Sequence, residues 1–392
     1  MTVHPVAPPE SVKPNPRVLV SKWDQWHSDR TITLRELEPR MIRIDLTPAQ
    51  QGDCLWIEYG DARRPYRILI DGGTPATFTI LKNRIESLPR EDRRFEVVII
   101  THIDSDHIGG ILELLKNPPS GLEIGDVWFN GFRHLPSSNK TLGVRQAEEV
   151  SKELETGRFP WNDKFDEGPI CVSSSGALPR IRLRDGMFLT LLSPYLEQLR
   201  ELQPKWQREI EALRRKELED TRHLKTKTLS LPLNVITLAE SPFESDIAEA
   251  NGSSLALMAE FEGKSLLLGA DAFAPVLERS VRRLLSTKGL EKLRLDAFKI
   301  SHHGSDANTS IDLLSIVDCR NYLISTNGSI YSHPDTRTVA RILKHGGEVK
   351  TLHFNYCSPQ TLVWKNRDLQ HRHRYETSFP IDPAAGASFI LS

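Results

Sequence analysis

The densest group of chemically capable side chains lies within Thr101–Gly110, which has the sequence THIDSDHIGG. Two imidazoles and two carboxylates stand within six residues: His102, Asp104, Asp106 and His107. Neutral nitrogen donors and anionic oxygen donors of these kinds bind divalent metal ions. The stretch therefore predicts a metal site.

The segment before this motif, FEVVIIT at 95–101, has the apolar run of a buried strand. Side chains that follow it are expected at the carboxyl end of the strand, where α/β folds place ligands. A helix is expected to open near His107 and run to Leu115. The alternative is a polar turn with Asp104 or Asp106 as a helix N-cap. The density of ligand types favours the metal site.

Three further candidates follow predicted strands downstream. Asp271 ends the run LLLGAD, which alone is weak evidence because strands often end in such turns. His302 and His303 lie in ISHHGS after an apolar strand, and a core imidazole would need polar partners. His333 lies in YSHP, which could instead begin a helix with proline in its first turn.

The elements that must position these residues form two similar halves. Each half has hairpin strands first and β/α units after them, which favours two packed sheets with helices outside. The first half has predicted strands at 41–46, 53–59, 66–70, 95–101 and 127–130, and helices at 75–88 and 143–156. The second has predicted strands at 254–261, 265–269, 296–300 and 321–326, and helices from 273 and at 335–344.

Composition narrows the class of protein. The 392 residues have a net charge of −1, so overall charge does not indicate a nucleic-acid partner. The four cysteines form no C-x-x-C pair, which argues against a disulfide scaffold or a thiolate zinc finger. No apolar stretch approaches the roughly 18 residues of a spanning helix. We expect a cytoplasmic protein without membrane association.

Two segments fall outside the regular pattern. Residues 1–40 are expected to be a Pro-rich N-terminal extension in which Trp23 and Trp26 could dock on the body. Residues at about 194–250 have apolar positions at helical spacing among many charges, which predicts a charged helical insertion. Either segment could bind a protein partner.

These motifs, taken in order, resemble the metallo-β-lactamase superfamily, and within it the branch that contains the hydrolase domain of the competence DNA-uptake channel. The resemblance covers roughly residues 41–350. It is carried by Gly52-Asp53, Ile70-Asp71-Gly72-Gly73, His102 to Gly110, Asn251-Gly252-Ser253-Ser254-Leu255, Gly269-Ala270-Asp271, His302 to Ser305 and Ser332-His333-Pro334. It implies an α/β fold, a four-layer αββα sandwich of two mixed sheets with outer helices, in one hydrolase domain over 41–392.

The resemblance also implies two divalent metal ions, Zn²⁺ or Mn²⁺, that activate a hydroxide. His102 and Asp104 would hold one ion and Asp106, His107 and His302 the other, with Asp271 bridging them. His303 could be the ligand in place of His302. Asp106 would act in catalysis as a ligand beside the hydroxide, and His303 or His333 could protonate the leaving group.

Two departures from the family pattern affect this assignment. Asp104 stands where the β-lactamases have a histidine, which makes the site harder and raises the odds of Mn²⁺. Many relatives also have a histidine between the first motif and the aspartate strand. Only His134 and His223 lie in that interval, and neither follows a convincing buried strand.

The leading hypothesis for the substrate is a phosphodiester, with nucleic acid as the partner. It rests on the resemblance, with weak support from two basic clusters that could follow a phosphate backbone. These are Arg214, Arg215, Lys216, Arg222, Lys225 and Lys227, and the run His371-Arg372-His373-Arg374. The alternatives are solvated surface clusters on a hydrolase of a small phosphoester or other ester, and a non-catalytic scaffold or regulatory subunit.

Overall fold

Two mixed β-sheets organise the part of the chain that the computed structural model describes, which comprises residues 40–136, 145–202, 204 and 233–391. The first sheet has the order β16-β1-β2-β3-β5-β7. Its strands are β16 (Ala387–Leu391), β1 (Arg40–Leu46), β2 (Leu55–Asp61), β3 (Tyr66–Ile70), β5 (Val97–Ile99) and β7 (Val127–Trp128). Pairing is antiparallel from β16 to β3 and parallel from β3 to β7.

The second sheet has the order β15-β14-β13-β12-β11-β10-β9-β8. Its strands are β15 (Tyr375–Ser378), β14 (Lys350–Phe354), β13 (Val317–Ile324), β12 (Leu293–Lys299), β11 (Lys264–Leu268), β10 (Ala256–Phe261), β9 (Phe188–Ser193) and β8 (Arg180–Arg182). The five strands β11 to β15 run parallel to one another. A separate pair joins β4 (Arg94–Phe95) to β6 (Glu123–Ile124).

Side-chain alternation along the strands divides the core into three clusters. In β3, Ile68 and Ile70 join the cluster between the two sheets, whereas Leu69 joins the one behind the first sheet. The run 266–268 in β11 alternates in the same way between the central cluster and the one behind the second sheet. Because successive strand residues point to opposite faces, both faces of each sheet are covered by apolar contacts.

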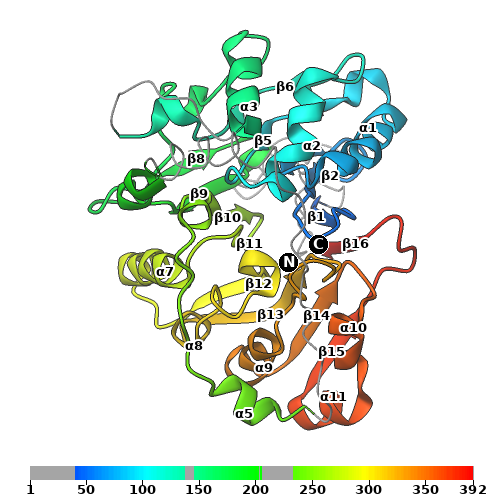
Figure 1. The fold of residues 1–392 in the computed structure, drawn as a ribbon, viewed down its shortest axis with the longest axis vertical. Coiled ribbons are helices and arrows are strands. Elements are labelled where there is room, and N and C mark those ends of the chain that lie inside the picture. The colour runs from blue at the N-terminus through cyan, green and yellow to red at the C-terminus, as the bar shows by residue number, and fades with distance from the viewer. Residues whose placement is uncertain (1–39, 137–144, 203, 205–232, 392) are drawn as a thin grey trace, which may run out of the picture. The chain divides into compact units, whose positions relative to one another are not determined.

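Helices cover the outer face of each sheet (Figure 1). Behind the first sheet lie α1 (Phe78–Ser87), α2 (Ser105–Lys116) and α3 (Arg145–Glu155). Behind the second lie α5 (Val235–Ala239), α7 (Ala274–Lys288), α8 (Ile311–Ser315) and α9 (Thr336–His345). Three further short helices are α6 (Glu249–Gly252), α10 (Pro359–Leu362) and α11 (Arg367–His373). Residues 196–202, at the start of the expected insertion, are also helical. The predicted four-layer sandwich of two mixed sheets with outer helices is confirmed.

Three parts of the sheets were not predicted from the sequence. β14 and β15 extend the second sheet beyond its last predicted strand. β8 and β9 add to the second sheet from residues that precede the expected insertion. β16 pairs antiparallel with β1, from Ile42 opposite Leu391 to Leu46 opposite Ala387. Local periodicity does not reveal this pairing, because its two partners stand at opposite ends of the described chain.

Several expectations fall on residues outside the described part. They include the N-terminal extension up to Pro39 with Trp23 and Trp26, and residues 205–232 of the expected insertion with His223 and the first basic cluster. A protein partner on either segment stays a prediction. Among the described helices, none combines the length and apolarity that crossing a membrane requires.

Candidate metal centre

The predicted site residues lie on loops at the carboxyl ends of parallel strands from both sheets. His102, Asp104, Asp106 and His107 follow β5 and lie before or within the first turn of α2. Asp271 follows β11, the adjacent His302 and His303 follow β12, and His333 follows β13. The packing of the two sheets therefore brings residues about 200 positions apart in sequence to one place, as the 3.1 Å separation of His107 Nε2 and His303 Nε2 shows.

Close backbone contacts seat the start of α2 against the neighbouring turns. A Cβ atom at Gly110 would overlap the carbonyl oxygen of Gly72, and one at Gly52 would overlap that of Asp106. The amide of Gly72 donates to the carbonyl of His107 at 2.8 Å. Glycine at these positions therefore lets the first motif approach the turn after β3.

The N-cap alternative for this motif is half right. Asp104 occupies the N-cap position of α2 with an extended backbone, but its side chain makes no capping hydrogen bond. Its Oδ2 lies 3.5 Å from Nε2 of His102 instead. The carboxylate is 44% exposed and faces the site, so it is available as a ligand.

The loops of the site hold non-glycine residues in the left-handed region. Asp71, Ala270, His302 and His303 have φ values of 57°, 46°, 48° and 53°. Such a backbone costs about 1–3 kcal/mol per residue and persists where the surrounding structure imposes it, often at functional sites. The strain is therefore consistent with loops that are shaped to aim side chains.

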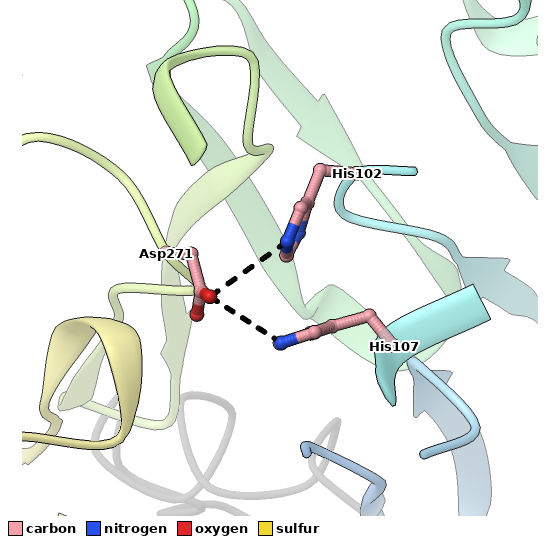
Figure 2. A group of neighbouring side chains, drawn as sticks. All are labelled: His102, His107 and Asp271. Atoms are coloured by element: carbon pink, nitrogen blue, oxygen red, sulfur yellow. Dashed lines mark ion pairs between the residues drawn. The ribbon is translucent and has the colours of Figure 1, made fainter. Parts of the chain in front are cut away.

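Asp271 is the centre of the arrangement (Figure 2). Its Oδ2 lies 3.4 Å from Nε2 of His107 and 3.7 Å from Nε2 of both His102 and His302. Its Oδ1 lies 3.8 Å from Nε2 of His303. These separations exceed those of good hydrogen bonds, and Asp271 Oδ1 and His102 Nε2 are buried without any hydrogen-bond partner. The gaps leave room for a cation among the atoms.

The outward nitrogens of the imidazoles are already engaged. His107 Nδ1 lies 2.8 Å from Asp71 Oδ2, and His303 Nδ1 lies 2.9 Å from the Ser325 carbonyl oxygen. Both partners accept hydrogen bonds, so in the neutral rings each Nδ1 donates and each Nε2 carries a lone pair. The facing Nε2 atoms cannot hydrogen-bond to each other in that state. Two nitrogens 3.1 Å apart, each about 2.1 Å from one ion, would subtend about 95°, which fits metal coordination.

Charge and burial shift the pKa values of the centre. Burial favours neutral His107, but the carboxylates of Asp271 and Asp71 raise its pKa well above the usual range. Burial likewise disfavours the Asp271 carboxylate, but the imidazoles of His107, His302 and His303 hold its pKa well below the usual range. The pKa of His302 rises to about 9, because Asp271 and a hydrogen bond to Asp246 outweigh burial. The centre stabilises positive charge.

Three sets of ligand atoms lie within 4.8 Å of one another in the described structure. They are His102 with His107 and Asp271, Asp106 with His107 and His303, and Asp53 with Asp271 and His303. In these sets His303, rather than His302, accompanies Asp106 and His107. Neither His302 nor Asp104 is in these sets, although His302 Nε2 lies 3.7 Å from Asp271 Oδ2, the oxygen that also faces His102. The residue types and spacings fit two divalent ions.

His333 and His134 lie in different surroundings. His333 Nδ1 is 3.2 Å from Asp335 Oδ2, and its ring centroid is 5.5 Å from that of His302. It therefore borders the centre, and Pro334 precedes the Asp335 N-cap instead of lying in the first turn of α9. His134 stacks edge-on against Trp161 with ring centroids 4.8 Å apart and joins no described ligand set.

The sequence analysis assigned no role to Asp53, Asp71 or Lys299. Asp71 orients His107 and also accepts from the amide and hydroxyl of Thr101 at 2.8 and 2.7 Å. Lys299 Nζ donates to Asp53 Oδ2 at 2.7 Å, and both side chains are at most 2% exposed. Burial opposes the charge on Asp53, but Lys299 and His303 hold its pKa below the usual range. The available signal was the placement of Asp53 and Asp71 beside glycines at strand ends.

Comparison with known proteins agrees with this architecture. Residues 48–149 match the family model described as the metallo-beta-lactamase superfamily. This stretch includes Asp53, Asp71 and the whole first motif. This stretch is thus similar to the metallo-β-lactamase superfamily, and the fold of two mixed sheets with outer helices is consistent with it. The search of curated proteins finds no match.

Solved structures with a similar fold are distant in sequence. The metallo-beta-lactamase fold protein YhfI from Bacillus subtilis has 9% identity and a TM-score of 0.39, over 90% of this chain and 100% of that one. CmlA, a diiron β-hydroxylase from Streptomyces venezuelae, has 12% identity and a TM-score of 0.39, over 90% of this chain and 54% of that one. A metallo-β-lactamase from Cronobacter sakazakii with a HARLDQ motif has 14% identity and a TM-score of 0.28, over 68% and 80%. Likenesses this low support no functional conclusion.

Proposed function

We propose that this chain is a two-metal hydrolase of phosphodiesters that acts on nucleic acid. The observation that carries the proposal is the convergence of four imidazole Nε2 atoms around Asp271, with the Asp104 carboxylate beside His102 and the Asp106 carboxylate beside His303. A degenerate scaffold has no need to retain such a complete set of charged ligands. The open alternative of a non-catalytic subunit gains no support from this geometry.

The ligands divide into two sides that share Asp271. We define the buried side as Asp106, His107 and His303, and the open side as His102, Asp104 and His302. Each would hold one divalent ion, Zn²⁺ or Mn²⁺. When bound, a pair of such ions makes water a competent nucleophile near neutral pH and neutralises charge on the scissile ester.

The remaining chemistry belongs to the chain's own residues. Asp71 and Ser325 orient the buried imidazoles, so their Nε2 atoms face inward without rearrangement. Nδ1 of His333 is beside Asp335, which leaves Nε2 to deliver a proton to the leaving oxygen or to contact a phosphate oxygen. His303 is less suited to that proton transfer, because both of its ring nitrogens are engaged within the buried side.

The choice of substrate rests on the resemblance to the DNA-uptake-channel branch. The cluster from His371 to Arg374 lies on α11 and at its C-cap, and no described contact connects it with the centre. A small phosphodiester is therefore the alternative. Asp104, in place of the histidine of the β-lactamases, makes a lactam substrate a poor fit.

A substrate panel tests the proposal. Purified chain is reconstituted with Mn²⁺ or Zn²⁺ and assayed on single-stranded DNA, double-stranded DNA, RNA and bis(p-nitrophenyl) phosphate, with Asp106→Ala as the matched inactive control. Cleavage of a nucleic acid by the wild type alone supports the proposal. Cleavage of the chromogenic diester alone points to a small substrate. Two bound ions without cleavage of any diester rule out the substrate class and leave the metal site standing.

A further inference from the structure

The adjacent histidines His302 and His303 point to different surroundings. Their ring planes are inclined by 69°, with centroids 5.9 Å apart. The His303 side chain is 2% exposed and faces His107, whereas the His302 side chain is 23% exposed and faces Asp271 Oδ2. Both residues have left-handed backbone, which splays the two side chains apart. Their roles therefore differ.

A polar cradle surrounds the outer nitrogen of His302. We use this name for Asp246, Asn251 and Asn308. His302 Nδ1 lies 2.9 Å from Asn308 Oδ1 and 3.4 Å from Asp246 Oδ2. Asp246 Oδ2 also accepts from Asn251 Nδ2 at 2.7 Å and from Asn308 Nδ2 at 3.1 Å. Among the described residues, His302 is the imidazole that the cradle contacts.

The cradle fixes the tautomer of His302. Asn308 Nδ2 donates to Asp246 and to the Asp271 carbonyl at 3.1 Å, so the atom that faces His302 is the Asn308 oxygen. The neutral ring of His302 then donates from Nδ1, which leaves the lone pair on Nε2, 3.7 Å from Asp271 Oδ2. This is the arrangement in which a metal-ligating histidine is held by an outer acceptor.

The cradle is built into the backbone as well. The Asp246 amide donates to the Ala307 carbonyl at 3.0 Å. Buried Arg341 donates to the carbonyls of Asp306 and Thr309 at 2.6 and 2.9 Å, and to that of Ser241 at 3.3 Å. These bonds join the segment before α6 to the loop that carries Asn308, so the Asp246 side chain is not needed to hold the two segments together.

We propose that His302 is the third ligand of the open side, in the place left without a middle-motif histidine, and that Asp246 and Asn308 are its positioning residues. The inference rests on the proposed two-metal function. Asp246 lies near the end of the expected insertion, 56 residues before His302 in the sequence. The position of the open-side ligand His302 would thereby depend on the segment that carries Asp246. The buried-side ligands His107 and His303 are instead positioned by Asp71 and Ser325.

Metal affinity tests this division directly, without an activity readout. The full chain and its Asp246→Ala, Asp246→Asn and His302→Ala variants are titrated with Mn²⁺ and with Co²⁺. Bound metal is measured by mass spectrometry, and the Co²⁺ absorption spectrum reports the ligand set. Asp312→Asn, an exposed carboxylate on α8, is the matched control, and thermal unfolding verifies that each variant is folded.

We expect Asp246→Ala to lower the affinity for one of the two ions by about 10–100-fold, which is the usual effect of removing a residue that hydrogen-bonds to a metal ligand. The affinity for the second ion should be unchanged. Asp246→Asn should lower the affinity for the first ion by a smaller factor, and His302→Ala should abolish binding of that same ion. Unchanged affinity for both ions in Asp246→Ala would overturn the inference, as would equal weakening of both. A wild type that binds neither metal would instead overturn the proposed function and this inference with it. Selective loss without any phosphodiesterase activity would support the inference while the substrate class falls.

Discussion

The buried and open sides of the centre differ in how the protein holds them. On the buried side, His107 and His303 are at most 2% exposed and their outer nitrogens bond to Asp71 and to a main-chain carbonyl. On the open side, His102 is buried, but Asp104 is 44% exposed and His302 is 23% exposed, against 17% for Asp106 on the buried side. Preorganised, desolvated ligands favour tight binding, whereas exposed ligands leave room for substrate oxygens.

This contrast indicates a division of labour. Under the proposed function, the buried side would retain an ion, and the open side would bring an ion and the substrate together. Asp271, 4% exposed and adjacent to all four imidazoles, links the two. Substitutions of Asp271, of a ligand on either side, and of a residue outside both sides should therefore differ in their effects on metal binding, turnover and stability.

The largest effect is expected for Asp271→Ala, which removes the residue common to both sides. Both ions should be lost, and phosphodiester turnover should fall by at least about 10⁴-fold, because water is then no longer a competent nucleophile at neutral pH. Metal content by mass spectrometry and turnover on the best substrate of the panel provide the measurement. Retention of one full-strength ion would show that the two sides do not share this carboxylate.

Asp106→Ala and Asp104→Ala form a matched pair, one carboxylate from each side. Asp106→Ala should lose the buried-side ion and activity together. Asp104→Ala should retain that ion and lose about 10²-fold in turnover, equivalent to about 2.7 kcal/mol of transition-state stabilisation. Neither change removes core packing, so the free energy of unfolding without metal should change by about 1 kcal/mol. Equal metal loss in both variants would contradict the distinction between the sides.

The sequence was informative about the buried side because most of its ligands are local. Asp106 and His107 stand in one motif after an apolar strand, and a strand end with paired histidines indicated the third ligand. The choice between His302 and His303 could not be made, because it depends on two left-handed residues and on acceptors from distant loops. Asp246 carried no signal either, because it belongs to none of the motifs and acts through His302.

The fold shows the same limit. The apolar runs within 66–70 and 265–269 were sufficient to predict two strands. The structure shows that both strands are buried on both faces. Lys299 within DAFKI gave no indication that its ammonium group is buried against Asp53, because that contact joins the two sheets across 246 positions. Local pattern specifies elements, and long-range polar contacts become visible only in the packed structure.

Lys299→Met tests a contact that adjoins the centre without belonging to either side's set of ligands. It leaves the buried Asp53 charge without its cation, so the free energy of unfolding should fall by about 3–5 kcal/mol. The double variant Asp53→Asn with Lys299→Met should recover most of that loss, because no unpaired charge remains. Urea unfolding of the metal-free chain supplies the measurement. A single variant as stable as the wild type would show that the pair contributes little.

A histidine outside the centre has a separate effect, which is confined to acidic pH. His134 is 5% exposed, and its Nδ1 accepts a hydrogen bond from the Gly131 amide at 3.1 Å. Burial, together with neighbouring Arg133, lowers its pKa to about 4. Protonation would remove the acceptor, so the folded chain favours the neutral ring.

The sign of the resulting pH dependence follows from proton uptake. The unfolded chain protonates His134 near its ordinary pKa of about 6.5, whereas the folded chain does so only near 4. The unfolded state thus binds more protons between these values, and this contribution to stability is fully present above about pH 6.5 and declines as pH falls toward 4. His134→Asn keeps an acceptor for Gly131 without titrating, so its stability should decline less over that window, by up to about 3 kcal/mol relative to the wild type. Urea unfolding at intervals from pH 7.5 to about 4 measures the difference, with exposed His371→Asn as the control. Parallel curves for wild type and His134→Asn would show that this ring does not contribute, and would leave the metal centre's predictions untouched.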